Sequence, residues 1–235
     1  MNSPALAVAF YDHARELYGS ARSGASVLFE GRRPTVVPEG PQVEPADGGW
    51  QATLPGRLSL EFEPVSAEAD LGGVAATVCR VRGEVSGKRV DGLGTVAETR
   101  SLPEWDQLDS LRTISALADD QHAALALGSR PRGARGHDEE IVTARLLDEG
   151  QLFEVETARI STVYDSGGRQ RSAGLELWIP GEEFARRGSG LVLAGSSLEL
   201  DGVQVHAAIF RWRLDGRDAT GAYELMVRAD PPTAA

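Results

Sequence analysis

Two glutamates at strand positions beside aromatic residues are the first candidates for chemistry in this chain. Glu176 and Trp178 fall two residues apart in one alternating segment, and Glu224 follows Tyr223 near the end of the sequence. A carboxyl group enclosed by apolar walls is favoured in its neutral form, which makes it a candidate proton donor. The alternative is that each glutamate faces solvent or pairs with an arginine, and the arginines in question are Arg159, Arg171, Arg211 and Arg213.

His206 is the third candidate catalytic residue. It alternates with Phe210 and Trp212 along one predicted strand, so the three side chains should share a face. An imidazole level with an indole is typical of a small-molecule pocket, in which Phe210, Trp212, Trp178 and Tyr223 would contact the ligand. The alternative is an exposed histidine, or a core histidine whose hydrogen bonds are satisfied.

A basic loop near the middle of the chain holds a further candidate. Residues 130–136 contain three arginines, and His137 and Glu139 follow them. As a ligand-binding loop it could hold an anion, or Glu139 could orient His137 as an acid or base. As a purely structural feature, it is a solvated turn whose opposite charges neutralise one another.

The motifs of the common cofactor-dependent enzymes are absent from the sequence. It has no glycine-rich phosphate loop, no His-Glu-x-x-His pair and no glycine-flanked nucleophilic serine. The single cysteine, Cys79, cannot form an internal disulfide bond and indicates no metal site. We therefore expect no cofactor and no metal.

The charge balance excludes other classes of partner. The formal net charge is −11, and the sequence pI is about 4.9. Nucleic acids and anionic membranes are not expected to bind, because phosphate binding relies on Lys and Arg. No stretch approaches the roughly 20 apolar residues of a membrane helix, and the N-terminus lacks the basic region of a signal peptide. The default expectation is a cytoplasmic protein, and its oligomeric state is not indicated.

The apolar pattern predicts an all-β chain after a short N-terminal helix. Over residues 4–17, helical spacing places Leu6, Phe10, Ala14 and Leu17 near one face. After this segment, short apolar runs are separated by turn residues about every ten positions, which is typical of antiparallel strands.

Short turns must join neighbouring strands, so the predicted sheet is an antiparallel meander. Residues 57–63 alternate most cleanly, and residues 86–87 are expected at the turn of a hairpin. A long meander leaves unpaired edges unless it closes, which favours one or two barrels, with a sandwich as the alternative. We divide the chain into residues 1–111 and 112–235, with the boundary placed between residues 102 and 136.

Two glycine-containing segments resemble a known family. The first covers residues 79–94 (CRVRGEVSGKRVDGLG) and leads to Trp105, and the second covers residues 212–224 (WRLDGRDATGAYE). Together with residues 164–169, they resemble the hydroxyneurosporene synthase and AttH-like group, a lipocalin-like superfamily that includes carotenoid hydratases and Diels–Alder cyclases. The resemblance implies paired lipocalin-like barrels and an apolar substrate, such as a polyene or polyketide, bound without a cofactor.

The resemblance also implies ligand-binding residues. The family's acid-histidine motif should fall near residues 98–105, where Arg100 and Trp105 match it and the acid-histidine pair is absent. Catalysis that depends on that pair is therefore not implied for this chain.

Three functions follow from these patterns. The leading hypothesis is a lipocalin-like protein that holds an apolar small molecule in a barrel cavity, as a cofactor-free isomerase, hydratase or cyclase of secondary metabolism. Glu176 or Glu224 would supply a proton, and Trp178, Trp212 and Tyr223 would face a developing cation. The second hypothesis is a non-catalytic carrier or sensor with the same cavity. The third is a scaffold whose barrels are filled by their own side chains.

Overall fold

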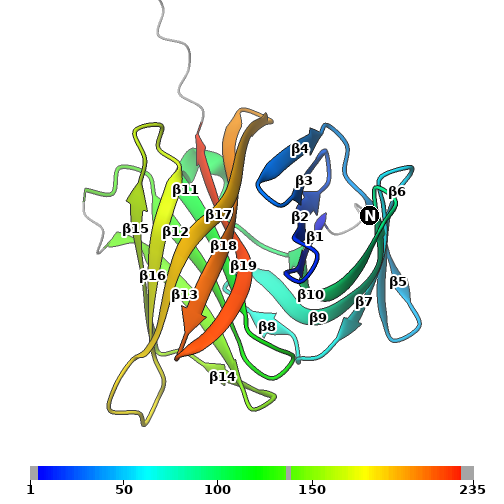
Figure 1. The fold of residues 1–235 in the computed structure, drawn as a ribbon. Coiled ribbons are helices and arrows are strands. Elements are labelled where there is room, and N and C mark those ends of the chain that lie inside the picture. The colour runs from blue at the N-terminus through cyan, green and yellow to red at the C-terminus, as the bar shows by residue number, and fades with distance from the viewer. Residues whose placement is uncertain (1–4, 136–138, 229–235) are drawn as a thin grey trace, which may run out of the picture.

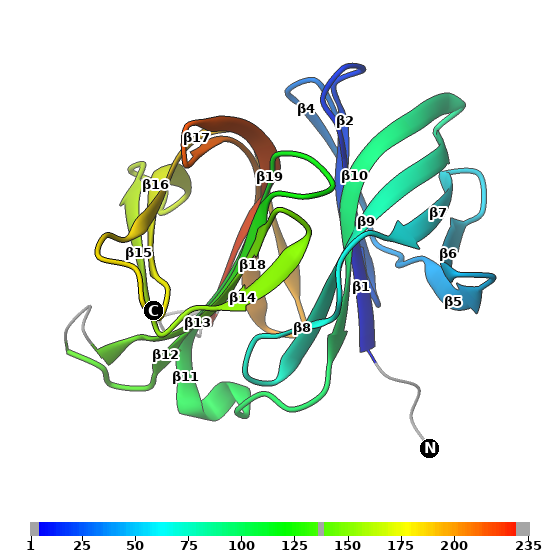
Figure 2. The ribbon, with the colours of Figure 1, turned by 90° about the horizontal axis from the view of Figure 1, so that it is seen from below.

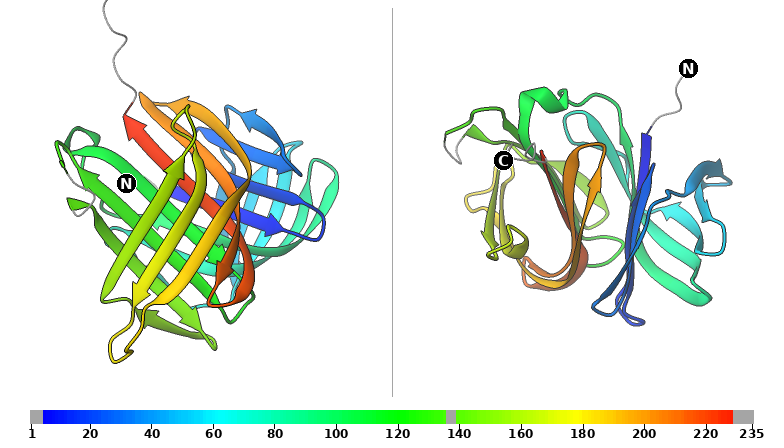
Figure 3. Two further views of the ribbon diagram at one scale, coloured as in Figure 1. Left: turned by 60° about the vertical axis from the view of Figure 1, so that its left-hand side comes forward. Right: turned by 90° about the horizontal axis from the view of Figure 1, so that it is seen from above.

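The computed structural model describes residues 5–135 and 139–228, and within them the chain forms two curled antiparallel sheets and one short 3-10 helix (Figure 1). The sheets stand side by side, one from the N-terminal part of the chain and one from the C-terminal part (Figure 2 and Figure 3). The predicted all-β class with antiparallel connectivity is confirmed.

The first sheet is an up-and-down barrel that is open at one seam. Its strands are β1 (Ala5–Asp12), β2 (Leu17–Arg22), β3 (Ala25–Glu30), β4 (Arg33–Val37), β5 (Gln42–Ala46), β6 (Gly49–Leu54), β7 (Leu58–Pro64), β8 (Ala69–Asp70), β9 (Val74–Val85) and β10 (Lys88–Thr99). They pair in the order β4-β3-β2-β1-β10-β9-β7-β6-β5, and β8 pairs with β9 outside this path. The first and last strands are therefore paired, and the seam falls between β4 and β5.

The second sheet has the same topology. The 3-10 helix η1 (Trp105–Gln107) leads into β11 (Leu108–Leu117), β12 (Ala123–Pro131), β13 (Ile141–Asp148), β14 (Gln151–Glu154), β15 (Thr157–Tyr164), β16 (Gln170–Trp178), β17 (Arg186–Leu200), β18 (Val203–Leu214) and β19 (Arg217–Arg228). The order is β14-β13-β12-β11-β19-β18-β17-β16-β15, so the first strand again pairs with the last. The seam falls between β14 and β15. The chain changes sheets between β10 and β11, and the domain division at residue 111 stays a prediction.

The helix predicted over residues 4–17 is wrong. Residues 5–17 form β1, a turn and the start of β2, with Glu16 at a φ of 52° in the turn. Val8 and Phe10 pack inside the first sheet, whereas Tyr11 packs against the second sheet, so both faces of β1 are buried. A strand buried on both faces has a continuous apolar run, and periodicity alone cannot distinguish such a run from a buried helical segment.

The clearest predicted strand and hairpin are confirmed. The side chains of Leu58, Leu60 and Phe62 are buried along β7, as their alternation predicts. The hairpin of β9 and β10 turns at Ser86 and Gly87, whose φ values are 49° and 77°. Positive φ at both central residues gives the backbone twist that a tight hairpin needs.

Residues 32–49, which are rich in proline and glycine, contain two short edge strands. β4 and β5 lie at the two ends of the first sheet and hold Pro34 and Pro45. Proline cannot donate a ladder hydrogen bond and is therefore tolerated mainly at sheet edges. The prolines thus mark the seam of this opened barrel.

Apolar side chains form three packed layers. Phe62 is buried inside the first sheet and Trp212 inside the second. A third cluster, which includes Val78, Leu125 and Ile209, lies between the sheets. The interior of each curled sheet is thus filled, and the two sheets are joined face to face as in a sandwich.

Gly221 provides a test of how closely β19 approaches β11. A Cβ atom built on Gly221 would lie 1.9 Å from the backbone oxygen of Ser115. We expect Gly221→Ala to lower the free energy of unfolding by about 1–3 kcal/mol, because overpacking forces the backbone to shift. Gly195→Ala is the matched control, since its Cβ would meet no atom nearer than 3.7 Å, and its effect should stay within about 0.5 kcal/mol. Urea unfolding measures both, and equal midpoints would contradict the close approach.

Candidate functional site

A cavity of about 320 Å³ lies between the two sheets. Its walls come from strands of both sheets, including β1 and β10 on one side and β11 and β19 on the other. Many of the lining side chains are small and apolar, among them Ala7, Ala9, Ala97 and Ala222. Facing sheets pack about 10 Å apart, so small residues at facing positions leave space that larger side chains would fill. The sequence suggested a cavity inside a barrel, whereas this one lies between two opened barrels.

Three polar side chains, contributed by both sheets, meet at one side of this cavity. Glu224 of β19 is only 6% exposed. Its carboxylate accepts a hydrogen bond from the Ser20 hydroxyl and pairs with the guanidinium of Arg22, both on β2. The ion pair therefore joins the two sheets across their interface.

The charge state of this cluster follows from its pairing. Burial lowers the pKa of Arg22 to about 10, so the guanidinium is still charged at neutral pH. A neighbouring guanidinium stabilises the ionised form of a carboxyl group. The ion pair favours the ionised form of Glu224, whereas the sequence suggested a neutral carboxyl group that donates a proton. The apolar walls are as expected, but Arg22 supplies a counter-charge.

Tyr11 forms a second polar link between the sheets. Its hydroxyl lies 2.8 Å from the Ser115 Oγ, and the backbone N–H of Ala222 donates to this Ser115 oxygen at 3.1 Å. Burial raises the pKa of Tyr11 to about 12, which keeps the phenol neutral. Tyr11 therefore acts in this wall as a neutral hydrogen-bonding group.

The resemblance-based residues differ in their placement. Trp105 of η1 lines the cavity together with Leu102. Arg100 does not line it, and its guanidinium forms ion pairs with Glu68 at 2.7 Å and Glu98 at 3.0 Å. His137 lies outside the described residues.

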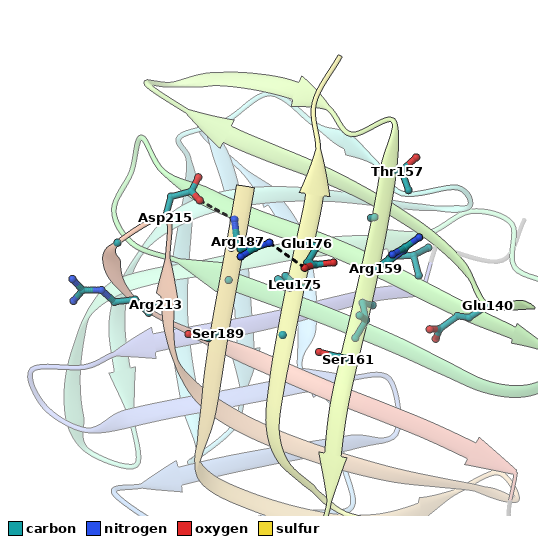
Figure 4. Close-up of a pocket in the computed structure, with 16 residues that line it drawn as sticks. Glu140, Thr157, Arg159, Ser161, Leu175, Glu176, Arg187, Ser189, Arg213 and Asp215 are labelled. Atoms are coloured by element: carbon teal, nitrogen blue, oxygen red, sulfur yellow. Dashed lines mark hydrogen bonds and ion pairs between the residues drawn. The ribbon is translucent and has the colours of Figure 1, made fainter. Parts of the chain in front are cut away.

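Glu176 and Trp178 lie on the outer side of the second sheet. A hollow of about 960 Å³ crosses β15, β16 and β17 there (Figure 4). Glu176 is partly exposed, and its Oε1 lies 3.8 Å from the Arg187 guanidinium. The Arg159 guanidinium stacks 5.3 Å above the Trp178 ring. This hollow is larger than the cavity between the sheets, but most of its charged side chains, such as Arg187 and Arg213, are exposed, and its buried Glu140 is already paired with Arg112. The smaller cavity is therefore the better candidate site.

Phe210, Trp212 and Tyr223 fill the interior of the second sheet. Phe210 and Trp212 stack with ring centroids 5.3 Å apart, and the Tyr223 ring lies 5.5 Å from that of Phe210. The Tyr223 hydroxyl is shared with Arg112 at 3.3 Å and Thr162 at 2.7 Å. Because these groups satisfy one another, they stabilise the packed interior rather than line the cavity between the sheets.

His206 lies on β18, where its Nδ1 is 2.7 Å from the Ser197 Oγ. Burial lowers the pKa of His206, and the positive charge of Arg169 lowers it further. The pair does not line the cavity between the sheets.

Four residues of the candidate site were missed by the sequence analysis, namely Tyr11, Ser20, Arg22 and Ser115. The first three lie on β1 and β2, where the sequence favoured a helix followed by a connection. Their partners lie in the second sheet, far away along the chain. Residues 6–11 form an unbroken apolar run without period-2 alternation, because both faces of β1 are buried, so no local pattern distinguishes this strand from a helix or indicates its partners.

Comparison with known proteins identifies the fold. No family model and no curated protein sequence matches the chain. An AttH-type protein from Nitrosomonas europaea is similar in structure, with a TM-score of 0.64 and 14% identity over 96% of this chain and 93% of that one. Kievitone hydratase from Nectria haematococca has a TM-score of 0.55 and 8% identity over 96% and 89% of the two chains. The chain therefore has an AttH-like, lipocalin-related fold, and the predicted resemblance is confirmed at the level of fold.

Among residues 5–135 and 139–228, no helix is long and apolar enough to cross a membrane. No group of three or more His, Cys, Asp or Glu side chains among them could hold a metal ion.

The ion pair of Arg22 and Glu224 leads to a stability prediction. We expect Glu224→Leu to lower the free energy of unfolding by about 3–5 kcal/mol, because Arg22 is left as an unpaired buried charge. The double variant Arg22→Met with Glu224→Leu should lose much less, because both charges are replaced by apolar groups. Arg213→Met, which breaks an exposed pair with Asp218, is the control and should change stability by less than about 1 kcal/mol. A double variant as unstable as Glu224→Leu would refute the ion pair of Arg22 and Glu224 as the cause of the loss.

His206 gives a prediction about pH. An NMR titration should place its pKa below the ordinary value of 6.5, with the signal assigned through His206→Asn. Since the unfolded chain takes up this proton more readily, His206 contributes stability above pH 6.5, and the contribution is lost as pH falls through the folded-state pKa. The stability difference between wild type and His206→Asn should therefore decline on acidification. A titration midpoint above 6.5 would contradict the buried environment.

Proposed function

We propose that the protein binds a small molecule with an apolar body and one polar group in the cavity between the sheets, and that Glu224 exchanges a proton with it. The observation that carries this proposal is the polar cluster of buried Glu224 with the partly buried Ser20 and Arg22 in an otherwise largely apolar cavity. Pockets of this composition use apolar contacts for affinity and a few convergent polar groups for orientation.

The chemistry that fits an ionised carboxylate is proton abstraction. In a hydration, Glu224 would take a proton from water while the water oxygen adds to one carbon of a polarised double bond. Glu224 would then return the proton to the neighbouring carbon, so that the product is the substrate plus one water. In an isomerisation, the same carboxylate would take a proton from one carbon and return it to another. Arg22 would stabilise negative charge that develops on an oxygen of the substrate.

Similarity to one solved structure favours a hydratase-type reaction over isomerisation or cyclisation. The structural neighbour from Nectria haematococca is named as a hydratase. The neighbour's substrate is not transferred to this chain. A carrier or sensor with the same cavity is the second candidate function, and the absence of a turnover step would distinguish it. A cytoplasmic location stays an expectation from the sequence.

The test begins with the ligand. Native mass spectrometry of the purified protein, followed by organic extraction, should find an apolar compound at about one equivalent per chain. Incubation of that compound with the protein in ¹⁸O-labelled water should add one labelled water for a hydratase. Incubation in D₂O should introduce deuterium for an isomerase. Unchanged compound in both solvents would leave only the carrier.

Glu224→Gln is the decisive variant, because it keeps the shape of the side chain and removes its basicity. We expect the rate to fall by about 10²–10⁴-fold, while the ligand still binds. Glu61→Gln, an exposed glutamate of β7, is the matched control. Loss of activity in Glu176→Gln instead would move the reaction to the outer hollow and reject this site.

A further inference from the structure

A second hollow lies behind the cavity between the sheets. Its volume is about 490 Å³, and the same four strands, β1, β10, β11 and β19, contribute to its lining. Tyr11 lines both hollows. The phenol ring therefore lies where the two spaces meet.

The strands show that the two hollows follow one another along a single groove. On β11, Ser115 lines the cavity and Leu117 lines the second hollow. On β19, Ala222 lines the cavity and Thr220 lines the second hollow. Each pair is two positions apart on one face of its strand, which corresponds to about 7 Å. The second hollow thus begins one side-chain step beyond the end of the cavity.

Tyr11 is the large side chain at this junction. Ala9 and Ala222, which surround the same end of the cavity, are small, so they do not close it. The Tyr11 ring is 4% exposed, and its hydroxyl is held by Ser115 on the opposite sheet. The ring therefore spans the space between the sheets and is fixed at both ends.

We infer that Tyr11 sets the length of the ligand that the cavity accepts, and that the second hollow is the continuation of the same channel beyond it. This inference rests on the proposed binding function. Its specific claim is that the ligand's apolar chain points along the groove toward Tyr11, with its polar group at Arg22. The far hollow contains Asp12, His13 and Arg211, so a chain that passed Tyr11 would leave the apolar part of the groove.

The experiment uses straight-chain alkan-1-ols, from hexanol to dodecanol, with isothermal titration calorimetry. The neutral hydroxyl can donate to Glu224 and accept from Arg22 without a second negative charge beside their ion pair, and each further buried methylene should tighten binding about fourfold. In the wild type, this gain in affinity should stop at the chain length that reaches Tyr11. In Tyr11→Leu, the gain should continue to longer alcohols. Tyr11→Phe keeps the ring and should stop at the same length as the wild type.

Thr220→Phe is the matched control, because Thr220 lines the second hollow and not the cavity, so the larger side chain reduces only the second hollow. Added to the wild type, it should leave the length profile unchanged, since Tyr11 already closes the groove. Added to Tyr11→Leu, it should restore the shorter limit on chain length that the wild type shows. Circular dichroism and thermal unfolding establish that each variant is folded. Tyr11→Met, whose flexible side chain adapts to irregular space, replaces Tyr11→Leu if the latter does not fold.

The possible outcomes separate the two proposals. Identical length profiles for the wild type and the folded Tyr11→Leu or Tyr11→Met variant, with clear binding to both, would overturn the role of Tyr11 and leave the binding function standing. Failure of every alcohol to bind either protein would reject the ligand class, and with it the inference. If Tyr11→Leu accepts longer chains and Thr220→Phe does not reverse this, the added space is not the second hollow. This result too would overturn the inference.

Discussion

The ion pair between Arg22 and Glu224 constrains how the two halves of this protein meet. A charge buried between apolar surfaces is costly unless its partner is in place, and here the two partners belong to different sheets. The sheets must therefore dock in one register, with β2 facing β19 closely enough for the two side chains to touch. The same docking brings Tyr11 to Ser115 and aligns the small residues that leave the cavity open.

The location of the candidate site follows from how the interiors are used. Each sheet is an opened barrel, and its concave side is filled by large side chains such as Phe62 in the first and Trp212 in the second. No ligand is needed to complete those cores. The interface between the sheets is different, because alanines and hydroxyl residues face one another there and cannot fill the space. A protein with two packed barrels can thus still hold a small molecule, provided that the molecule lies between them.

Much of the fold could be predicted from the sequence, because antiparallel strands with tight turns leave local signals. The alternation of Leu58, Leu60 and Phe62, and the turn at Ser86 and Gly87, are examples. The N-terminal helix was predicted wrongly because β1 is buried on both faces and shows no simple polar alternation. Of the site, Glu224 and Trp105 could be selected by residue type and resemblance, and both line the cavity. Arg22 and Tyr11 could not, since their roles arise from contacts with residues more than a hundred positions away.

The pairing of first and last strands in each sheet bears on how the protein is made. One edge of β1 has no partner until β10 has been synthesised, and one edge of β11 has none until β19 has been synthesised. Sheets held by such distant contacts form slowly, and their unpaired edges invite association with other chains. Because Glu224 lies on β19, the candidate site is assembled only after β19 has emerged. Until their partner strands emerge, the free edges of β1 and β11 therefore need protection in the nascent chain.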